Sequence, residues 1–173
     1  GGIPAVGKTT IVKQFFYKYK NWKSFKYKKL YGHYSGELNL IILGKYIENE
    51  LFSGTDKLSM AVQPDFEEFI DKEKPPYNIL FEGDRLFNIK TLQKVKDKMT
   101  LQVYIVTSNN TDQRHIDRND SQSEKFIKGR LTKVENIRNF LKEDYITLTN
   151  NEEQDIGKNF EIIMNNYNNF RGI

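Results

Sequence analysis

The sequence predicts an α/β fold in which a mostly parallel sheet carries helices on both faces. Apolar stretches alternate with amphipathic ones along the chain, which is the pattern of successive strand and helix units. Two of these stretches, residues 78–81 and 101–108, are apolar enough for strands that are buried on both faces. A glycine-rich opening, residues 1–7, stands directly before a helical pattern. These features predict three layers in a single domain over residues 1–173.

The first half of the chain is expected to contain two helices and two strands. A helix is expected over residues 10–20, and residues 24–44 are expected to form two strands joined by a turn that contains Gly32 and Gly36. A helix near residues 61–72 ends before Pro75 and Pro76, because proline cannot continue a helix.

The second half repeats the alternation. Residues 77–85 form a short strand that ends in acidic residues, and a helix follows at 88–98. After the apolar strand 101–108 comes a polar and basic stretch, 111–130. A helix near 131–142, a strand at 145–149 and a closing helix near 152–168 complete the chain.

The opening residues fit the pattern G-x-x-x-x-G-K-[ST], which is typical of a loop that binds the phosphates of a nucleotide. Glycines at 2 and 7 let backbone N–H groups turn toward an anion, together with those of Val6 and Thr10. Lys8 is expected to reach the β and γ phosphates of ATP, and the Thr9 hydroxyl to bind Mg²⁺. A chance glycine-rich turn before a helix is the alternative.

Such a loop normally follows a buried strand, and no apolar stretch stands before Gly1. We therefore expect the first strand to be missing from the chain, which would then be a piece of a longer one.

Composition excludes several classes of protein. No apolar run approaches the roughly 20 residues that cross a bilayer, so we expect no membrane partner. The chain has no cysteine, which excludes a disulfide framework and a thiolate metal site and fits a cytoplasmic location. The net charge of +4 conceals an asymmetry, because residues 1–36 hold eight lysines and no acidic residue.

Lysines alternate with aromatic residues between positions 15 and 31. This mixture can bind the backbone of a polyanion and stack on its bases. It is equally the pattern of a solvated helix end followed by an amphipathic strand in a lysine-rich protein. The sequence leaves both interpretations open.

An acidic residue at the carboxyl end of a buried strand is the second element of a nucleotide site. Glu82 follows the apolar residues 78–81 and is expected to hold Mg²⁺ or its water ligands, beside Thr9. Asp84 and Arg85 follow it and are candidates for substrate binding. An ordinary helix N-cap cluster is the alternative.

The basic stretch is the third element and is expected to form a lid over residues 111–130. Arg114, Arg118 and Arg130 are three of only six arginines in the chain. Arginines on a mobile segment can neutralise charge on a transferred phosphoryl group and exclude water. Arg114 is assigned to nucleotide binding, and Arg118 and Arg130 to catalysis together with Lys8. The guanine-reading pattern N-K-x-D of a GTPase is absent from the sequence.

Asp56 is a candidate general base. A kinase that phosphorylates a hydroxyl benefits from a carboxylate that accepts its proton. Lys57 and Ser59 stand beside Asp56 and could orient the acceptor. The alternative is that Asp56 or Ser59 caps the helix that follows.

With these elements in place, the chain resembles P-loop kinases of the nucleoside monophosphate and polynucleotide kinase group. The resemblance implies a three-layer P-loop NTPase fold. "FEGDR" is similar to the acid-Gly-x-x-Arg strand end of that group, with Glu82 where aspartate is commoner. More narrowly, residues 43–62, 79–88 and 114–137 resemble the bacteriophage kinases that act on 5-hydroxymethyluracil in DNA.

If the resemblance holds, the γ-phosphoryl group of ATP passes to the hydroxymethyl oxygen of a modified pyrimidine in DNA, and Asp56 takes the proton. The enzyme would act in the cytoplasm of the host cell and flip its target base out of the duplex. Two other functions stay open at this point. One is a kinase of a deoxynucleoside monophosphate or another small molecule, and the other is a nucleotide-binding switch that hydrolyses little.

Overall fold

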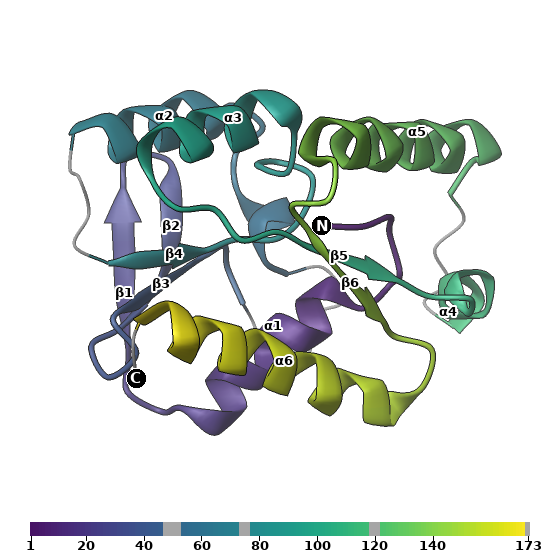
Figure 1. Ribbon diagram of the computed structural model, residues 1–173, viewed down its shortest axis with the longest axis horizontal. Coiled ribbons are helices and arrows are strands. Elements are labelled where there is room, and N and C mark those ends of the chain that lie inside the picture. Colours follow the sequence, from purple (N-terminus) through teal and green to yellow (C-terminus); the bar gives the residue numbers. More distant parts are fainter. Residues whose placement is uncertain (47–52, 73–76, 118–121, 172–173) are drawn as a thin grey trace.

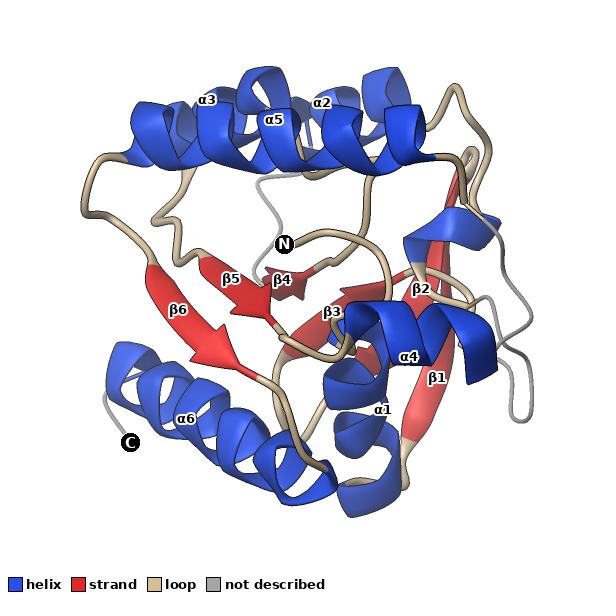
Figure 2. Ribbon diagram, turned by 90° about the vertical axis from the view of Figure 1, so that its right-hand side faces the viewer, coloured by secondary structure: helices blue, strands red, loops and turns tan. Residues whose placement is uncertain are grey.

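The computed structural model describes residues 1–46, 53–72, 77–117 and 122–171. Its strands are flanked by helices on two sides (Figure 1 and Figure 2). Helices α2 (Gln63–Lys72), α3 (Ile89–Lys98) and α5 (Glu124–Leu141) lie on one side. Helices α1 (Lys8–Lys18) and α6 (Glu153–Arg171) lie on the other, and the short helix α4 (Thr111–Asp117) lies near the start of α1.

The predicted mostly parallel sheet of a three-layer P-loop NTPase is wrong. The described strands form two sheets, and the larger is mainly antiparallel, with the order β1-β2-β3-β4. Its strands are β1 (Trp22–Tyr27), β2 (Leu30–Ser35), β3 (Leu40–Leu43) and β4 (Asn78–Leu80), and only the β3–β4 pair is parallel. The second sheet pairs β5 (Tyr104–Thr107) with β6 (Ile146–Thr149) in parallel.

Tight turns explain the antiparallel part. Lys28 at the β1–β2 turn and Asn39 before β3 both have positive φ angles, 51° and 52°, which let the chain reverse within a few residues. The expected turn at Gly32 is instead an interior position of β2. A Cβ atom at Gly32 would lie 2.4 Å from the carbonyl oxygen of Ile42, so only glycine lets β3 approach this closely.

Apolar side chains fill the space between the strands and both helix layers. Phe15 of α1 packs edge-to-face on Phe160 of α6, with ring centroids 5.0 Å apart. On the opposite side, Phe66 of α2 and Leu92 of α3 are each 1% exposed. This packing fixes the start of α1 relative to the strand ends where the candidate site lies.

Candidate functional site

The glycine loop forms as a turn that leads directly into α1. Gly2 and Gly7 have φ angles of 134° and 90°, which other residues adopt only with strain. Helix α1 begins at Lys8, no side chain caps its first turn and no acidic residue stands in that turn. Its first N–H groups and its positive dipole end therefore suit an anion.

Lys8 lies folded over this loop. Its Nζ donates to the carbonyl oxygens of Gly2, at 3.0 Å, and Ile3, at 2.7 Å. The ammonium thus lies within the ring of backbone groups that a phosphate chain would occupy. A phosphate oxygen can replace these carbonyl acceptors with a charge-assisted bond.

Thr9 and Glu82 are 73 residues apart in the sequence and in contact in the fold. The Thr9 hydroxyl donates to Glu82 Oε1 at 3.1 Å. Glu82 is only 6% exposed, and burial raises the pKa of its carboxyl group, although the Lys8 ammonium opposes this shift. A second cation placed beside Glu82 would compensate for the burial of its charge.

These two side chains fit a magnesium ion. Mg²⁺ in phosphate-transfer sites is usually held by one or two carboxylates, with substrate phosphates and water completing the shell. No group of three or more histidine, cysteine or acidic residues that could hold a metal occurs among the described residues. The Thr9–Glu82 pair offers one hydroxyl and one carboxylate, so an ion held there would need further ligands from phosphate or water.

The surroundings of Glu82 include residues that the sequence did not single out. Thr55 is fully buried and its hydroxyl donates to the Glu82 carbonyl oxygen. The Tyr46 hydroxyl is buried, and burial together with the Glu82 charge raises the pKa of Tyr46 well above its usual value. The pattern around Tyr46 carries no motif, so only the fold identifies it.

Asp56 lies at the rim of this site, in the short 3₁₀ helix Thr55–Lys57. Its side chain is exposed at the surface yet partly desolvated by the site wall, which raises the pKa of its carboxyl group, while Lys8 lowers it. Arg85 Nη2 donates to the Asp56 backbone oxygen at 3.5 Å. A carboxyl group with a raised pKa beside the glycine loop is suited to accept a proton.

Asp84 joins the strand end to α5. Its carboxylate pairs with Arg130 at 3.0 Å and with Lys133 at 3.2 Å. Arg130 also lies over the Phe126 ring, 4.6 Å from its centroid. The expected phosphate ligand Arg130 is therefore held by an acidic partner, while it still acts electrostatically on Asp56. Lys133 was missed as a site residue, although it lies one helical turn from Arg130.

Arg114 lies on the far side of the loop. Its guanidinium donates to the carbonyl oxygens of Ala5, at 3.2 Å, and Asn150, at 2.9 Å. Asn150 is 1% exposed and donates from Nδ2 to the Val6 oxygen at 2.7 Å, while its Oδ1 is buried without a hydrogen-bond partner. Asn150 was not among the predicted residues, but its position directly after strand β6 was a usable signal, because ligands bind at the carboxyl ends of parallel strands.

The other predicted site residues differ in burial and in their distance from the glycine loop. Val6 is fully buried and packs in the core, and Thr10 lies in the first turn of α1. Lys57 and Ser59 are exposed near Asp56, and Ser59 Oγ accepts from the Ala61 amide at 3.2 Å. Arg118 lies outside the described residues.

In the lysine-rich stretch near the start of the chain, the lysines and the aromatic residues have different surroundings. Its lysines at 23 and 26 are exposed on β1, an edge strand. Its rings mostly pack within the protein, since Trp22 contacts Phe16 at 4.8 Å and Phe25 contacts Phe69 at 5.4 Å between centroids. The exposed lysines can meet a polyanion, but these packed rings do not offer free faces for base stacking.

Comparisons with known proteins add nothing to this description: no family model, no curated protein and no solved structure matches the chain. Among the described residues, no helix is both long and apolar enough to cross a membrane.

Proposed function

We propose that the protein is an ATP-dependent phosphotransferase that moves the γ-phosphoryl group of ATP to a hydroxyl acceptor. The observation that carries the proposal is the contact of Thr9 with Glu82, at the mouth of a loop that also presents Lys8. A glycine loop alone indicates nucleotide binding. A buried carboxylate on the threonine hydroxyl of that loop adds a place for the metal that accompanies ATP.

In this reaction, the backbone N–H groups of the loop and the Lys8 ammonium bind the triphosphate, and Thr9 and Glu82 hold the magnesium ion. The ion, when bound, neutralises charge on the phosphates and orients them. The acceptor oxygen attacks the γ-phosphorus, the bond to the β-phosphate oxygen breaks, ADP leaves, and Asp56 takes the hydroxyl proton. Its raised pKa favours this role, because a stronger base accepts a proton more readily.

The acceptor that the resemblance implies is the hydroxymethyl group of 5-hydroxymethyluracil in phage DNA. The exposed lysines of β1 support a polyanionic acceptor, since phosphate contacts by lysine dominate the affinity of DNA-binding proteins. A small-molecule acceptor such as a deoxynucleoside monophosphate would need no such contacts.

Transfer of label from γ-labelled ATP tests the proposal. The protein is incubated with Mg²⁺ and, in parallel, with hydroxymethyluracil DNA, ordinary DNA, free deoxynucleotides or no acceptor. Label on the modified DNA alone supports the full proposal. Label on mononucleotides would mean that the acceptor is a free deoxynucleotide and not DNA. Binding of ATP without any transfer would refute the kinase assignment and favour a nucleotide-binding switch.

Lys8→Ala is the matching variant. Loss of its charge from beside the transferred phosphoryl group is expected to reduce transfer by at least about 10²-fold. Lys90→Ala is the control, because Lys90 also lies in the first turn of a helix but is 74% exposed and pairs with Glu67. Equal transfer by both variants would contradict the assignment of the loop.

A further inference from the structure

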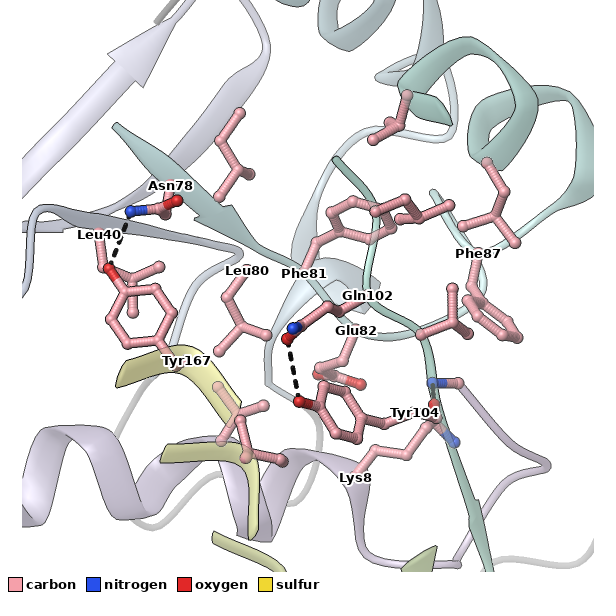
Figure 3. Close-up of a pocket in the computed structure, with 18 of the residues that line it drawn as sticks. Lys8, Leu40, Asn78, Leu80, Phe81, Glu82, Phe87, Gln102, Tyr104 and Tyr167 are labelled. Atoms are coloured by element: carbon pink, nitrogen blue, oxygen red, sulfur yellow. Dashed lines mark hydrogen bonds between the residues drawn. The ribbon is translucent and has the colours of Figure 1, made fainter. Parts of the chain in front are cut away.

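Strand β6 forms an open edge of the smaller sheet. Among the residues that the structure describes, β6 pairs with β5 alone. The other side of β5 faces the larger sheet, since Tyr104 of β5 and Leu80 of β4 line the same pocket (Figure 3). Figure 2 shows β6 as the outermost strand, with α5 above it and α6 below it. The free side of β6 therefore faces outward.

The side chains of β6 do not protect this edge. Strand β1, at one end of the larger sheet, carries the exposed Lys23 and Lys26, and lysines on an edge strand discourage pairing with another chain. Strand β6 reads Ile-Thr-Leu-Thr, with neither a charge nor a proline. Its Ile146 is 41% exposed. An uncharged edge with β-branched residues is suited to pair with a further strand.

Alternate backbone groups of β6 point away from β5. The Ile146 amide donates to the Val103 oxygen at 2.9 Å, so Ile146 faces β5. The N–H and C=O groups of one strand residue point to the same side, and successive residues alternate. Thr147 and Thr149 therefore present theirs at the outer edge. Within the described part of the chain, nothing bonds to the Thr147 amide, the Thr147 oxygen or the Thr149 amide.

Two other groups on this edge already have partners in the same chain. Asn159 Nδ2 donates to the Thr149 oxygen at 2.8 Å, and the Tyr145 amide donates to the Glu143 oxygen at 2.8 Å. In an antiparallel pair of β6 strands centred on Thr147, the two Thr147 residues exchange both bonds, and each Thr149 amide meets the partner's Tyr145 oxygen. All four bonds fall on groups that have no partner within one described chain.

We propose that β6 is the interface of a homodimer, in which the β6 strands of two copies pair antiparallel about a twofold axis at Thr147. The occupant is a second copy, because the free groups of this edge match those of the same edge rotated by 180°. Asp144 before the strand stands opposite the partner's Asn150, so like charges are not opposed. This inference is independent of the phosphotransferase proposal.

Apolar side chains beside the edge suit the same contact. In this register Ile146 stands opposite the partner's Leu148, on the same face of the joined sheet. Ile162 of α6 is also 41% exposed and lies one helical turn after Asn159, whose amide faces β6. A standard interface buries about 1,200–2,000 Å², so the flanking helices must add to the area of the paired strands.

Sedimentation equilibrium over a range of protein concentrations tests the proposal. We expect a mass that rises toward twice the 20.4 kDa of one chain. Thr147→Lys sets two ammonium groups opposite each other and is expected to weaken dimerisation about fivefold or more. Ser24→Lys is the control, because Ser24 is exposed on the edge strand β1. A monomer at every concentration, or equal dimerisation of the two variants, would overturn the proposal.

Cysteine variants test the register. The chain has no cysteine, so Thr147→Cys and Thr149→Cys each introduce its only thiol. At Thr147 the two Cα atoms are expected about 5.5 Å apart, within the reach of a disulfide. At Thr149 they are expected roughly 13 Å apart, which is too far. Oxidation should therefore cross-link the first variant alone, and equal cross-linking of both would contradict the register.

Hydrogen exchange of the unsubstituted protein tests the backbone bonds. The amides of Thr147 and Thr149 gain acceptors only in the dimer, so their exchange should slow as the protein concentration rises. Exchange at these two amides that does not depend on concentration, in a protein that dimerises, would place the interface on another surface and overturn the proposal.

Discussion

Gly54 provides a sharp test of how the fold positions Glu82. It precedes the short 3₁₀ helix with φ 80° and ψ −146°, a backbone region that is essentially restricted to glycine. A Cβ atom at this position would lie 2.0 Å from Glu82 Oε1, the same oxygen that accepts from Thr9. Gly54→Ala therefore strains the backbone and displaces the carboxylate without altering the glycine loop.

The size of the effect follows from these two contributions. Backbone strain at such an angle costs about 1–3 kcal/mol. In a domain of this length, 1 kcal/mol moves the unfolding midpoint by about 2–4 °C, so we expect the variant to unfold roughly 2–12 °C lower. A magnesium-dependent ligand present at about 100 times its Kd stabilises the parent protein by about 2.7 kcal/mol, and the variant should lose most of that increment.

Thermal unfolding is measured without ligand, with ATP and a chelator, and with Mg·ATP. Gly129→Ala is the control, because Gly129 lies inside α5 and a Cβ atom there meets nothing within 4 Å. Gly129→Ala is expected to leave the free energy of unfolding unchanged or to raise it by about 0.4–1 kcal/mol, so its unfolding midpoint should not fall. An unchanged midpoint and an unchanged magnesium increment in Gly54→Ala would refute the placement of Glu82 as a metal ligand.

Three other expectations follow. Asp56→Asn should slow transfer by about 10²-fold or more. In the parent protein the rate should fall at low pH as Asp56 becomes protonated, and the raised pKa of Asp56 moves this fall to higher pH; the variant should lack it. Initial rates measured across pH test both expectations. Arg114→Ala should weaken Mg·ATP binding in calorimetry, because the loop loses its bond at Ala5. Burial lowers the pKa of His33 in the folded protein below 6.5, its usual value in the unfolded chain. Between these two pKa values the unfolded chain binds more protons than the folded protein, so the free energy of unfolding falls as the pH falls. Urea midpoints at pH 7.5 and 5.5 should therefore differ less in His33→Gln than in the parent.

The elements that depend on neighbouring residues were predicted well, because their causes are local. Helix α1 begins at Lys8, and α3 begins after Asn88, whose side chain accepts from the Thr91 amide at 3.0 Å. Proline, glycine spacing and apolar periodicity act within one or two turns of chain. The lid was less well predicted, because α5 already starts at Glu124, within the stretch expected to be a polar lid.

Strand pairing was predicted poorly. The apolar content of residues 24–44 identified strands, but it did not reveal that three antiparallel strands would form there. A buried strand has the same composition whether its neighbour runs parallel or antiparallel, and the direction depends on turns such as the one at Lys28.

By itself, the sequence determined a glycine-rich turn, the helix behind it and an acidic residue after an apolar strand, and it predicted that the turn binds phosphate. Only the tertiary structure decided that Glu82 meets Thr9, that Asp84 holds Arg130, and that Asn150 and Arg114 bind the loop. The physical reason is range. Backbone angles and helix starts depend on residues close in sequence, whereas these contacts join segments dozens of residues apart and form only when the whole core has packed.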